Sequence, residues 1–298
     1  KVDENTFVGD CDSEHPQARV YGGHVLAQAM SAAYFTAPKG FFIHSIHCYF
    51  VRGGEEDVPI EFKVTRVRDG RNFAVRYVEA KQGGKTIHLS EYSLQKLDGP
   101  VDNFKVSPPP PEIERLPRPE ELQSDEESRH AFHSVGGDLR QMRGLETQRM
   151  APSIDLRPTD LSLFLHGDEG KKRKQLHWMR YKNVVDPSDY MLQHSTLVYM
   201  SDMNLATTGS LVHPEKKFKL ITSLDHSAWF HDYKSVTYAR IKMPNGLFSF
   251  NVNDWMIYEQ EVVSNSANRS LIYGRIWSED GRLLMTTAQE ALIYKARI

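Results

Sequence analysis

The chain contains 13 histidines and two cysteines, the residue types that most often bind metal ions or act as nucleophiles. None of the histidines forms the His-Glu-x-x-His pattern of a zinc hydrolase. His44 and His47 lie three residues apart in a predicted strand, so their side chains point to opposite faces and do not share a metal. The neighbours Asp225 and His226 also point apart, and Cys48 is interpreted as a small buried residue. We therefore expect no metal site and no cysteine nucleophile.

The first third of the chain predicts one helix followed by antiparallel strands. Residues 24–35 are rich in Ala, Leu and Met and contain neither Pro nor Gly, which favours a helix that Pro38 and Gly40 end. Aromatic, β-branched or alternating residues predict strands at residues 42–50, 60–67, 73–80 and 86–94. Asp69-Gly70 and Gly83-Gly84 supply the turns between them.

The second half repeats this order of elements. Residues 174–182 predict a strand, and residues from 189 to about 204 predict a helix with Ser188 or Asp189 as its N-cap. Further strands are predicted at residues 218–230, 255–263, 270–278 and 283–294, with a turn at Asp280-Gly281. The shared order predicts two copies of one helix-plus-sheet unit.

A Pro-rich segment separates the two halves. Ser107 is followed by four prolines, and Pro117 and Pro119 come soon after. Proline excludes regular helix and central strand, so the segment is interpreted as a stiff connector. Residues 120–145 are charged and are predicted to be partly helical. The charged run at 167–174 is interpreted as a solvated loop, with a contact to a substrate phosphate as the alternative.

Composition limits the class of protein. The 298 residues include 37 Lys and Arg against 39 Asp and Glu, a net charge of −2, which argues against a nucleic-acid binder driven by bulk charge. No stretch approaches the ~18 apolar residues that span a bilayer, so we expect no membrane span. Two cysteines favour a reducing compartment. The chain begins with Lys1 and shows no signal peptide, and we expect that its ends are trimmed.

Five stretches occur in the order in which they are found in one enzyme family. They lie at residues 20–29, 44–52, 201–204, 223–231 and 288–290, and they include Tyr-Gly-Gly-His, Ser-Asp-Met-Asn and Ala-Gln-Glu. On these motifs nearly the whole chain closely resembles the acyl-CoA thioesterase II family, which includes bacterial enzymes and the eukaryotic peroxisomal acyl-CoA thioesterases.

This resemblance implies an α+β double hotdog fold, in which each of two antiparallel sheets wraps around a long central helix. We expect an N-terminal hotdog at residues 1–106, the Pro-rich linker at 107–145 and a C-terminal hotdog at 146–298 that carries the catalytic residues. It also implies an acyl-CoA thioester hydrolase that converts fatty acyl-CoA to free fatty acid and CoA.

Matched motif by motif, the resemblance assigns catalysis to Asp202, Ser223 and Gln289, which would together hold and activate a water. Asp202 falls near the end of the predicted second helix, where the helix dipole and burial would raise the pKa of a carboxylate and suit it to act as a base. The alternative is a solvated aspartate at a helix end.

Ser223 and Gln289 have the groups needed to position a water. Ser223 is not surrounded by the Gly-x-Ser-x-Gly elbow of a nucleophilic serine, so it is expected to orient water by donating and accepting hydrogen bonds. Gln289 shares a strand face with Met285 and Thr287, and its amide could hold the water or the thioester oxygen. Purely structural roles are the alternative for both residues.

Gly22 and Gly23 stand at the start of the first predicted helix. Backbone N–H groups at a helix N-terminus would stabilise the negative charge that develops on a thioester oxygen, so both glycines are candidate substrate-binding residues. A tight turn explains them equally well.

The chain departs from compact members of the family at residues 232–253, which look like an inserted hairpin or loop. Two other functions stay open. A hotdog enoyl-CoA hydratase would also use a carboxylate and a water, whereas a non-catalytic acyl-CoA sensor would normally carry a DNA-binding region that is not evident here.

The expected partner is the acyl-CoA substrate, with neither cofactor nor metal and no nucleic acid. Hotdog sheets have exposed edges that usually pair with a second copy, so we expect a homodimer or homotetramer. Ala296-Arg297-Ile298 comes close to a small-basic-Leu peroxisomal address but ends in Ile, and a peroxisomal location is expected, with the cytoplasm as the alternative.

Overall fold

The structure is a computed structural model that describes residues 1–11, 19–96, 106–128, 152–168, 172–213, 218–231 and 250–295. The chain forms two compact units. The first comprises residues 1–107, 185–200 and 225–252, and the second comprises residues 108–184, 201–224 and 253–298. Residues 129–145, most of the expected insertion at 232–253 and the address at 296–298 lie outside the described residues. No described helix combines the length and the apolar character needed to cross a membrane.

The first unit is an antiparallel sheet with the strand order β1-β3-β4-β5-β2-β9. Its strands are β1 (Thr6–Gly9), β2 (Phe41–Phe50), β3 (Ile60–Asp69), β4 (Phe73–Gln82), β5 (Lys85–Lys96) and β9 (Asp225–Phe230). Burial alternates along β3 and β4, as expected of strands with one face toward a core. The predicted turns at Asp69-Gly70 and Gly83-Gly84 join β3 to β4 and β4 to β5, and Gly83 and Gly84 both have positive φ.

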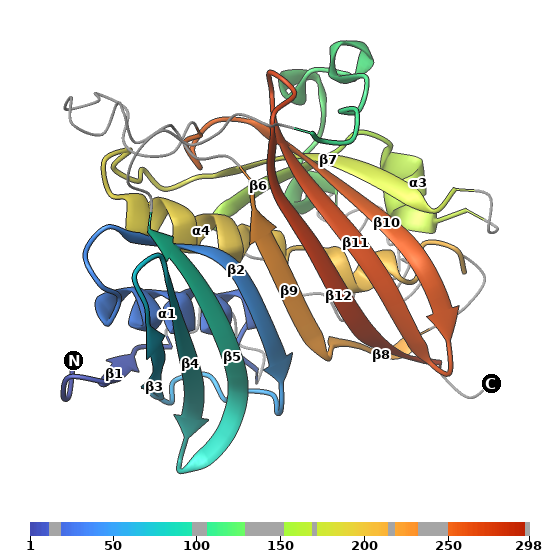
Figure 1. Cartoon of the computed structure of the whole chain (residues 1–298). Helices are drawn as coiled ribbons and strands as arrows, with labels where there is room; N and C mark the ends of the chain where they lie inside the picture. The colour runs from blue at the N-terminus through green and yellow to red at the C-terminus, as the bar shows by residue number, and fades with distance from the viewer. Residues whose placement is uncertain are drawn as a thin grey trace. The chain divides into compact units, whose positions relative to one another are not determined.

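Helix α1 (Gly22–Phe35) packs on β2, β3, β4 and β5 (Figure 1). Leu26, Met30 and the alanines at 29, 32 and 33 are among its buried residues. It ends at Phe35, and the hydroxyl of the C-cap residue Thr36 donates to the Ala33 carbonyl. Arg76 of β4 is fully buried and donates to the Thr36 carbonyl over 2.9 Å and to Asp69 over 2.6 Å. One guanidinium therefore fixes the end of the helix to the sheet.

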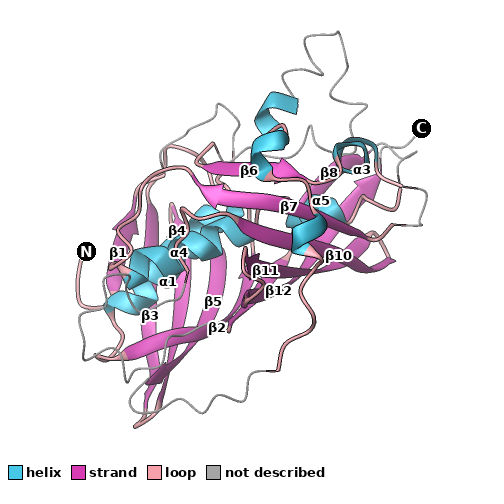
Figure 2. Cartoon of the chain, turned by 90° about the horizontal axis from the view of Figure 1, so that it is seen from above, coloured by secondary structure: helices cyan, strands magenta, loops and turns pink. Residues whose placement is uncertain are grey.

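Helix α4 (Tyr190–Ser201) lies alongside α1 (Figures 1 and 2). The Ser31 hydroxyl donates to the Ser195 hydroxyl over 3.1 Å, and the Tyr34 hydroxyl lies 2.5 Å from Nδ1 of His194. Asp189 accepts a hydrogen bond from the Leu192 amide, which confirms it as the predicted N-cap.

The second unit is also an antiparallel sheet, with the strand order β8-β12-β11-β10-β7-β6. Its strands are β6 (Ile154–Pro158), β7 (Lys174–Tyr181), β8 (Phe218–Ser223), β10 (Met256–Ser266), β11 (Arg269–Ser278) and β12 (Leu283–Lys295). Helix α3 (Leu161–His166) connects β6 to β7, and the short helix α5 (Leu205–Thr208) packs on β8, β10, β11 and β12. The predicted turn at Asp280-Gly281 joins β11 to β12.

The prediction of a single strand at 218–230 is wrong, because the segment forms two strands, β8 and β9, that are separated by Leu224. β8 pairs with β12, and β9 pairs with β2. The Leu224 amide donates to the Glu290 carbonyl over 2.8 Å at this point. The bend also means that Ser223 and Asp225 do not lie on one continuous strand face.

The second helix is shorter than predicted. α4 ends at Ser201, and residues 202–204 form a turn before α5 begins at Leu205. Asn204 has the left-handed backbone conformation, with φ of 62°, which ends a helical path and which Asn tolerates better than most residues. Asp202 therefore lies in the turn after the helix.

The described part of the Pro-rich segment, residues 106–128, forms the single-turn helices η1 (Ile113–Arg115) and η2 (Pro119–Glu121). Residues 125–128 are helical, in line with the prediction that residues 120–145 are partly helical, and residues 108–128 belong to the second unit. The Trp178 indole donates to the Pro117 carbonyl over 2.9 Å. A hydrophobic cluster joins the segment to three strands through Ile113, Trp178, Ile257 and Trp277. A segment interpreted as a connector thus covers one face of a sheet.

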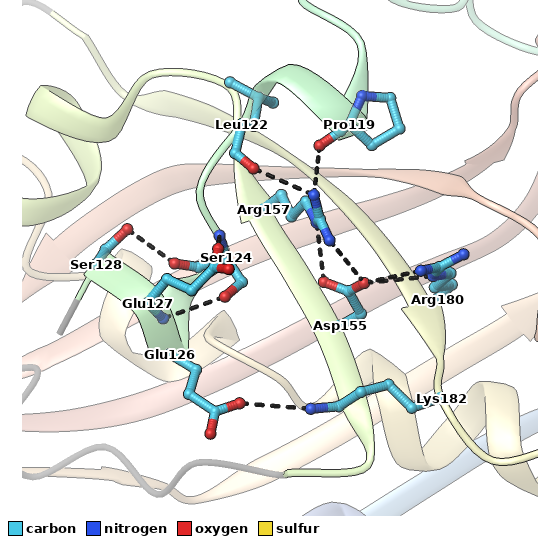
Figure 3. A network of polar contacts seen from close by, with 10 residues as sticks. All are labelled: Pro119, Leu122, Ser124, Glu126, Glu127, Ser128, Asp155, Arg157, Arg180 and Lys182. Carbon is cyan, nitrogen blue, oxygen red and sulfur yellow. Dashed lines mark hydrogen bonds and ion pairs between the residues drawn. The ribbon is translucent and has the colours of Figure 1, made fainter. Parts of the chain in front are cut away.

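Charged groups hold the same segment beside β6 and β7 (Figure 3). Arg157 donates to the carbonyls of Pro119, over 2.7 Å, and Leu122, over 3.2 Å. Asp155 pairs with Arg157 at 3.0 Å and with Arg180 at 3.2 Å, and both guanidiniums lie over the Trp255 ring. The arginines therefore pair with a carboxylate, stack on an aromatic ring and satisfy backbone carbonyls together.

Candidate active site

Ser223 and Gln289 are brought into direct contact. Ser223 is the last residue of β8, and Gln289 lies on the fully buried face of β12 with Met285 and Thr287. The Gln289 amide Nε2 donates to Ser223 Oγ over 2.7 Å. The pairing of β8 with β12, in which Ser223 is opposite Ala291, places the two side chains within reach.

Asp202 is only 8% exposed and lies in the turn between α4 and α5, within the same compact unit as Ser223 and Gln289. Two buried side chains of β10 hold the backbone on either side of it. The Tyr258 hydroxyl donates to the Ser201 carbonyl, and the Gln260 amide donates to the Met203 carbonyl over 2.8 Å. These two hydrogen bonds fix the backbone on both sides of Asp202.

Contacts across the sheet continue from this turn to the strand of Gln289. The Tyr258 hydroxyl lies 3.4 Å from the hydroxyl of Thr287, which is two residues before Gln289 on the same face of β12. Burial raises the pKa of Tyr258 well above its usual range, and the negative charge of Asp202 raises it further. The charge of Asp202 therefore acts on the Tyr258 side chain, and the Tyr258 hydroxyl in turn lies near Thr287 on β12, the strand that carries Gln289.

Sequence reasoning did not single out Tyr258, Gln260 or Thr287. Each is a polar residue inside a predicted strand, and each is fully buried. Buried polar side chains at core positions need partners, so this pattern is a signal that could have identified them.

Gly22 and Gly23 lie at the start of α1, in the first unit. A Cβ at position 23 would come within 2.5 Å of the Tyr199 carbonyl oxygen, so the approach of α4 requires glycine there. Their expected role in substrate binding stays a prediction.

The histidines have separate surroundings. His44 lies 2.8 Å from the Ser93 hydroxyl of β5, whereas His47 lies 3.1 Å from the Ser227 hydroxyl of β9. His88 is fully buried, and burial lowers its pKa to about 3, with a smaller contribution from His226. Among the described residues, no group of three or more His, Cys, Asp or Glu side chains could hold a metal ion. Cys48 is buried, as predicted.

The fold is shared with solved structures. The chain superposes on the tesB protein of Mycobacterium avium subspecies paratuberculosis with a TM-score of 0.71 and 25% identity, over 98% of this chain and 94% of that one. A protein of unknown function from Alicyclobacillus acidocaldarius, described as having a hot dog fold, gives a TM-score of 0.69 at 18% identity, over 100% and 96% of the two chains. The architecture is thus a mixed α and β hotdog fold with antiparallel strands.

Sequence comparisons then define the family. Residues 12–92 match the acyl-CoA thioesterase N-terminal domain, and residues 119–293 match the acyl-CoA thioesterase C-terminal domain. The chain is 32% identical to human acyl-coenzyme A thioesterase 8, over 98% of this chain and 85% of that protein. It is 30% identical to acyl-CoA thioesterase 2 of Haemophilus influenzae, over 98% and 93%. The chain belongs to the acyl-CoA thioesterase family.

A third relative is the peroxisomal acyl-coenzyme A thioester hydrolase 1 of Saccharomyces cerevisiae. It is 25% identical, over 92% of this chain and 85% of that protein.

Proposed function

We propose that this protein hydrolyses fatty acyl-CoA to free fatty acid and CoA with a water activated by Asp202, Ser223 and Gln289. The observation that carries the proposal is the 2.7 Å contact between Gln289 and Ser223, in the unit that also buries Asp202. Membership of the acyl-CoA thioesterase family supplies the reaction class.

In this mechanism the Asp202 carboxylate takes a proton from a water, and the oxygen attacks the thioester carbonyl carbon. The tetrahedral intermediate collapses, the carbon–sulfur bond breaks, and the CoA thiolate takes up the proton that Asp202 holds. Because Ser223 accepts a hydrogen bond from Gln289, the Ser223 hydroxyl proton is directed elsewhere and can orient the water. The step needs neither a metal nor an acyl-enzyme.

The test is the release of free thiol from saturated acyl-CoA esters of increasing chain length, followed with a thiol-trapping reagent. Thiol release supports hydrolysis, and its chain-length profile gives the substrate preference. An enoyl-CoA hydratase would leave a saturated ester intact and would hydrate an enoyl-CoA instead. A sensor would bind acyl-CoA without turnover.

The finer architecture is a double hotdog, with an N-terminal hotdog at residues 1–106, a linker at 107–145 and a C-terminal hotdog at 146–298. The two domain matches, at residues 12–92 and 119–293, support two hotdog units but not the boundary at 146, and the compact units of the structure divide the chain differently. Helices α1 and α4, of 14 and 12 residues, are the candidate central helices. Separate expression of residues 146–298 tests whether this part folds by itself.

The protein acts as a homodimer or homotetramer, because hotdog sheets have edges that pair with a second copy. Light scattering coupled to gel filtration measures this state. A peroxisomal location is supported by the name of the yeast relative, and the cytoplasm is the alternative. Imaging of the full-length protein with its native ends tests the location.

A further inference from the structure

Two residues on the same face of β10, Tyr258 and Gln260, satisfy backbone carbonyls on both sides of Asp202. Carbonyls in the last turn of a helix have no partner within the helix, and Ser201 is the last residue of α4. Its carbonyl accepts from the Tyr258 hydroxyl, and the Met203 carbonyl accepts from Gln260 over 2.8 Å. Tyr258 and Gln260 are both fully buried, so one strand face holds the turn at two points.

The amide of Gln260 is itself oriented by two further side chains. Its Oε1 accepts from the Gln175 amide over 3.0 Å and lies 2.7 Å from the Thr208 hydroxyl. Gln175 also donates to the Thr208 hydroxyl over 2.7 Å. Rotating the Gln260 amide by half a turn would place two N–H groups together at Gln175 and two carbonyls together at Met203. The Gln260 Nε2 therefore faces the turn that contains Asp202 and donates to the Met203 carbonyl.

The Tyr258 ring fits in its position because the neighbouring strand, β11, has a glycine there. A Cβ on Gly274 would lie 2.8 Å from the Tyr258 hydroxyl and 2.2 Å from the Thr287 hydroxyl. Gly274 is opposite Gln260 on one side and Thr287 on the other. The glycine leaves room for the phenol to reach across β11 toward β12.

We propose that Tyr258 and Gln260 are positioning residues that fix the Asp202 carboxylate for catalysis. The inference rests on the proposed function, because it assumes that Asp202 is the base. Tyr258 acts through the backbone and does not serve as a general acid, since its proton is donated to the Ser201 carbonyl. A misplacement of a catalytic group by about 1 Å can cost on the order of 10²-fold in rate, so two backbone anchors have a measurable effect.

The test is the variant Tyr258→Phe, which removes one hydroxyl, alongside Gln260→Met and Gly274→Ala. We expect kcat to fall by about 10- to 100-fold while KM stays within about 2-fold. Binding of a non-hydrolysable acyl-CoA thioether is expected to be unchanged. In an Asp202→Asn background, Tyr258→Phe is expected to cause no further loss of the residual rate, because both changes act through one carboxylate.

The matched control is Tyr92→Phe, which also removes a buried tyrosine hydroxyl that donates to a helix carbonyl, that of Leu26, in the other unit. It is expected to keep the parental kcat. Parental kcat in Tyr258→Phe, or losses that multiply in the Asp202→Asn background, would overturn the positioning role while the proposed function stands. Full activity of Asp202→Asn alone would overturn both.

Discussion

The Gln289 amide donates to Ser223 Oγ over 2.7 Å, although 66 residues separate the two in sequence. The contact exists because β8 lies against β12 with Ser223 opposite Ala291. The two groups therefore have different roles. Gln289 is the donor in this hydrogen bond, and the Ser223 hydroxyl can donate its proton to another acceptor. An orienting pair of this kind suits a bound water better than a covalent nucleophile.

Asp202→Asn is expected to reduce thiol release by about 10²- to 10⁴-fold, because an amide cannot take the proton from water. The substitution keeps the shape of the side chain, so the melting temperature is expected to change little. Asp254→Asn, which changes an exposed carboxylate in the same unit, is the control and is expected to keep parental activity. Full hydrolysis by the Asp202 variant would contradict its role as base.

Ser223→Ala is expected to lower kcat by about 10- to 100-fold, because the water loses one orienting group but the base remains. A nucleophilic serine would instead leave almost no activity when removed. Rapid-quench measurements on the parent protein distinguish the two cases further, since hydrolysis by water shows no burst of acylated protein. A burst that disappears in Ser223→Ala would argue for covalent catalysis.

Arg76→Ala is expected to lower the free energy of unfolding by about 2–4 kcal/mol, because the Thr36 carbonyl loses its buried donor and a cavity remains. Urea denaturation measures the change. Arg66→Ala on the neighbouring strand removes only an exposed hydrogen bond to Asn5, and a change within about 0.5 kcal/mol is expected. Equal effects of the two substitutions would show that Arg76 does not anchor the helix.

Because His88 is fully buried, we expect the free energy of unfolding to fall in mild acid. Burial lowers its pKa to about 3, so the unfolded chain binds a proton at this site near its ordinary pKa, whereas the folded chain stays neutral. Stability is therefore lost as the pH falls through the ordinary value. Between about pH 7 and about pH 5, this one group lowers the free energy of unfolding by about 2 kcal/mol.

Comparing urea denaturation of the parent and His88→Leu at both pH values isolates this contribution. The variant is expected to lose about 2 kcal/mol less than the parent between the two pH values. His44→Leu, whose ring is only half-buried, is the control and is expected to change the pH dependence less. Identical pH dependence in the parent and His88→Leu would contradict the prediction.

Local sequence predicted most of the strands, because alternation and the Gly-containing turns act over a few residues. It could not reveal the split at Leu224, since strand partners depend on contacts far along the chain. Residues 107–119 were correctly expected to lack regular helix and strand, but composition does not show that the Pro117 carbonyl accepts a hydrogen bond from the Trp178 indole. That contact depends on a surface formed by β7, β10 and β11.

The candidate site was predicted through resemblance, which supplied residue identities without their distances. The contact between Ser223 and Gln289 and the placement of Asp202 after α4 required the structure. Tyr258 and Gln260 were not predicted, because β10 is buried on both faces from Met256 to Gln260 and its sequence does not show which backbone groups lie against each face. Only the register across β11 relates Tyr258 to Gly274 and Thr287.

The register between β8 and β12 holds the candidate site together. β8 pairs with β12 along its length, and Ser223 lies opposite Ala291. A slip by one position would turn every side chain of β8 to the opposite face of the sheet. Ser223 would then point away from Gln289. A single residue inserted into β8 would therefore remove the hydroxyl from the site without changing any of the candidate catalytic residues.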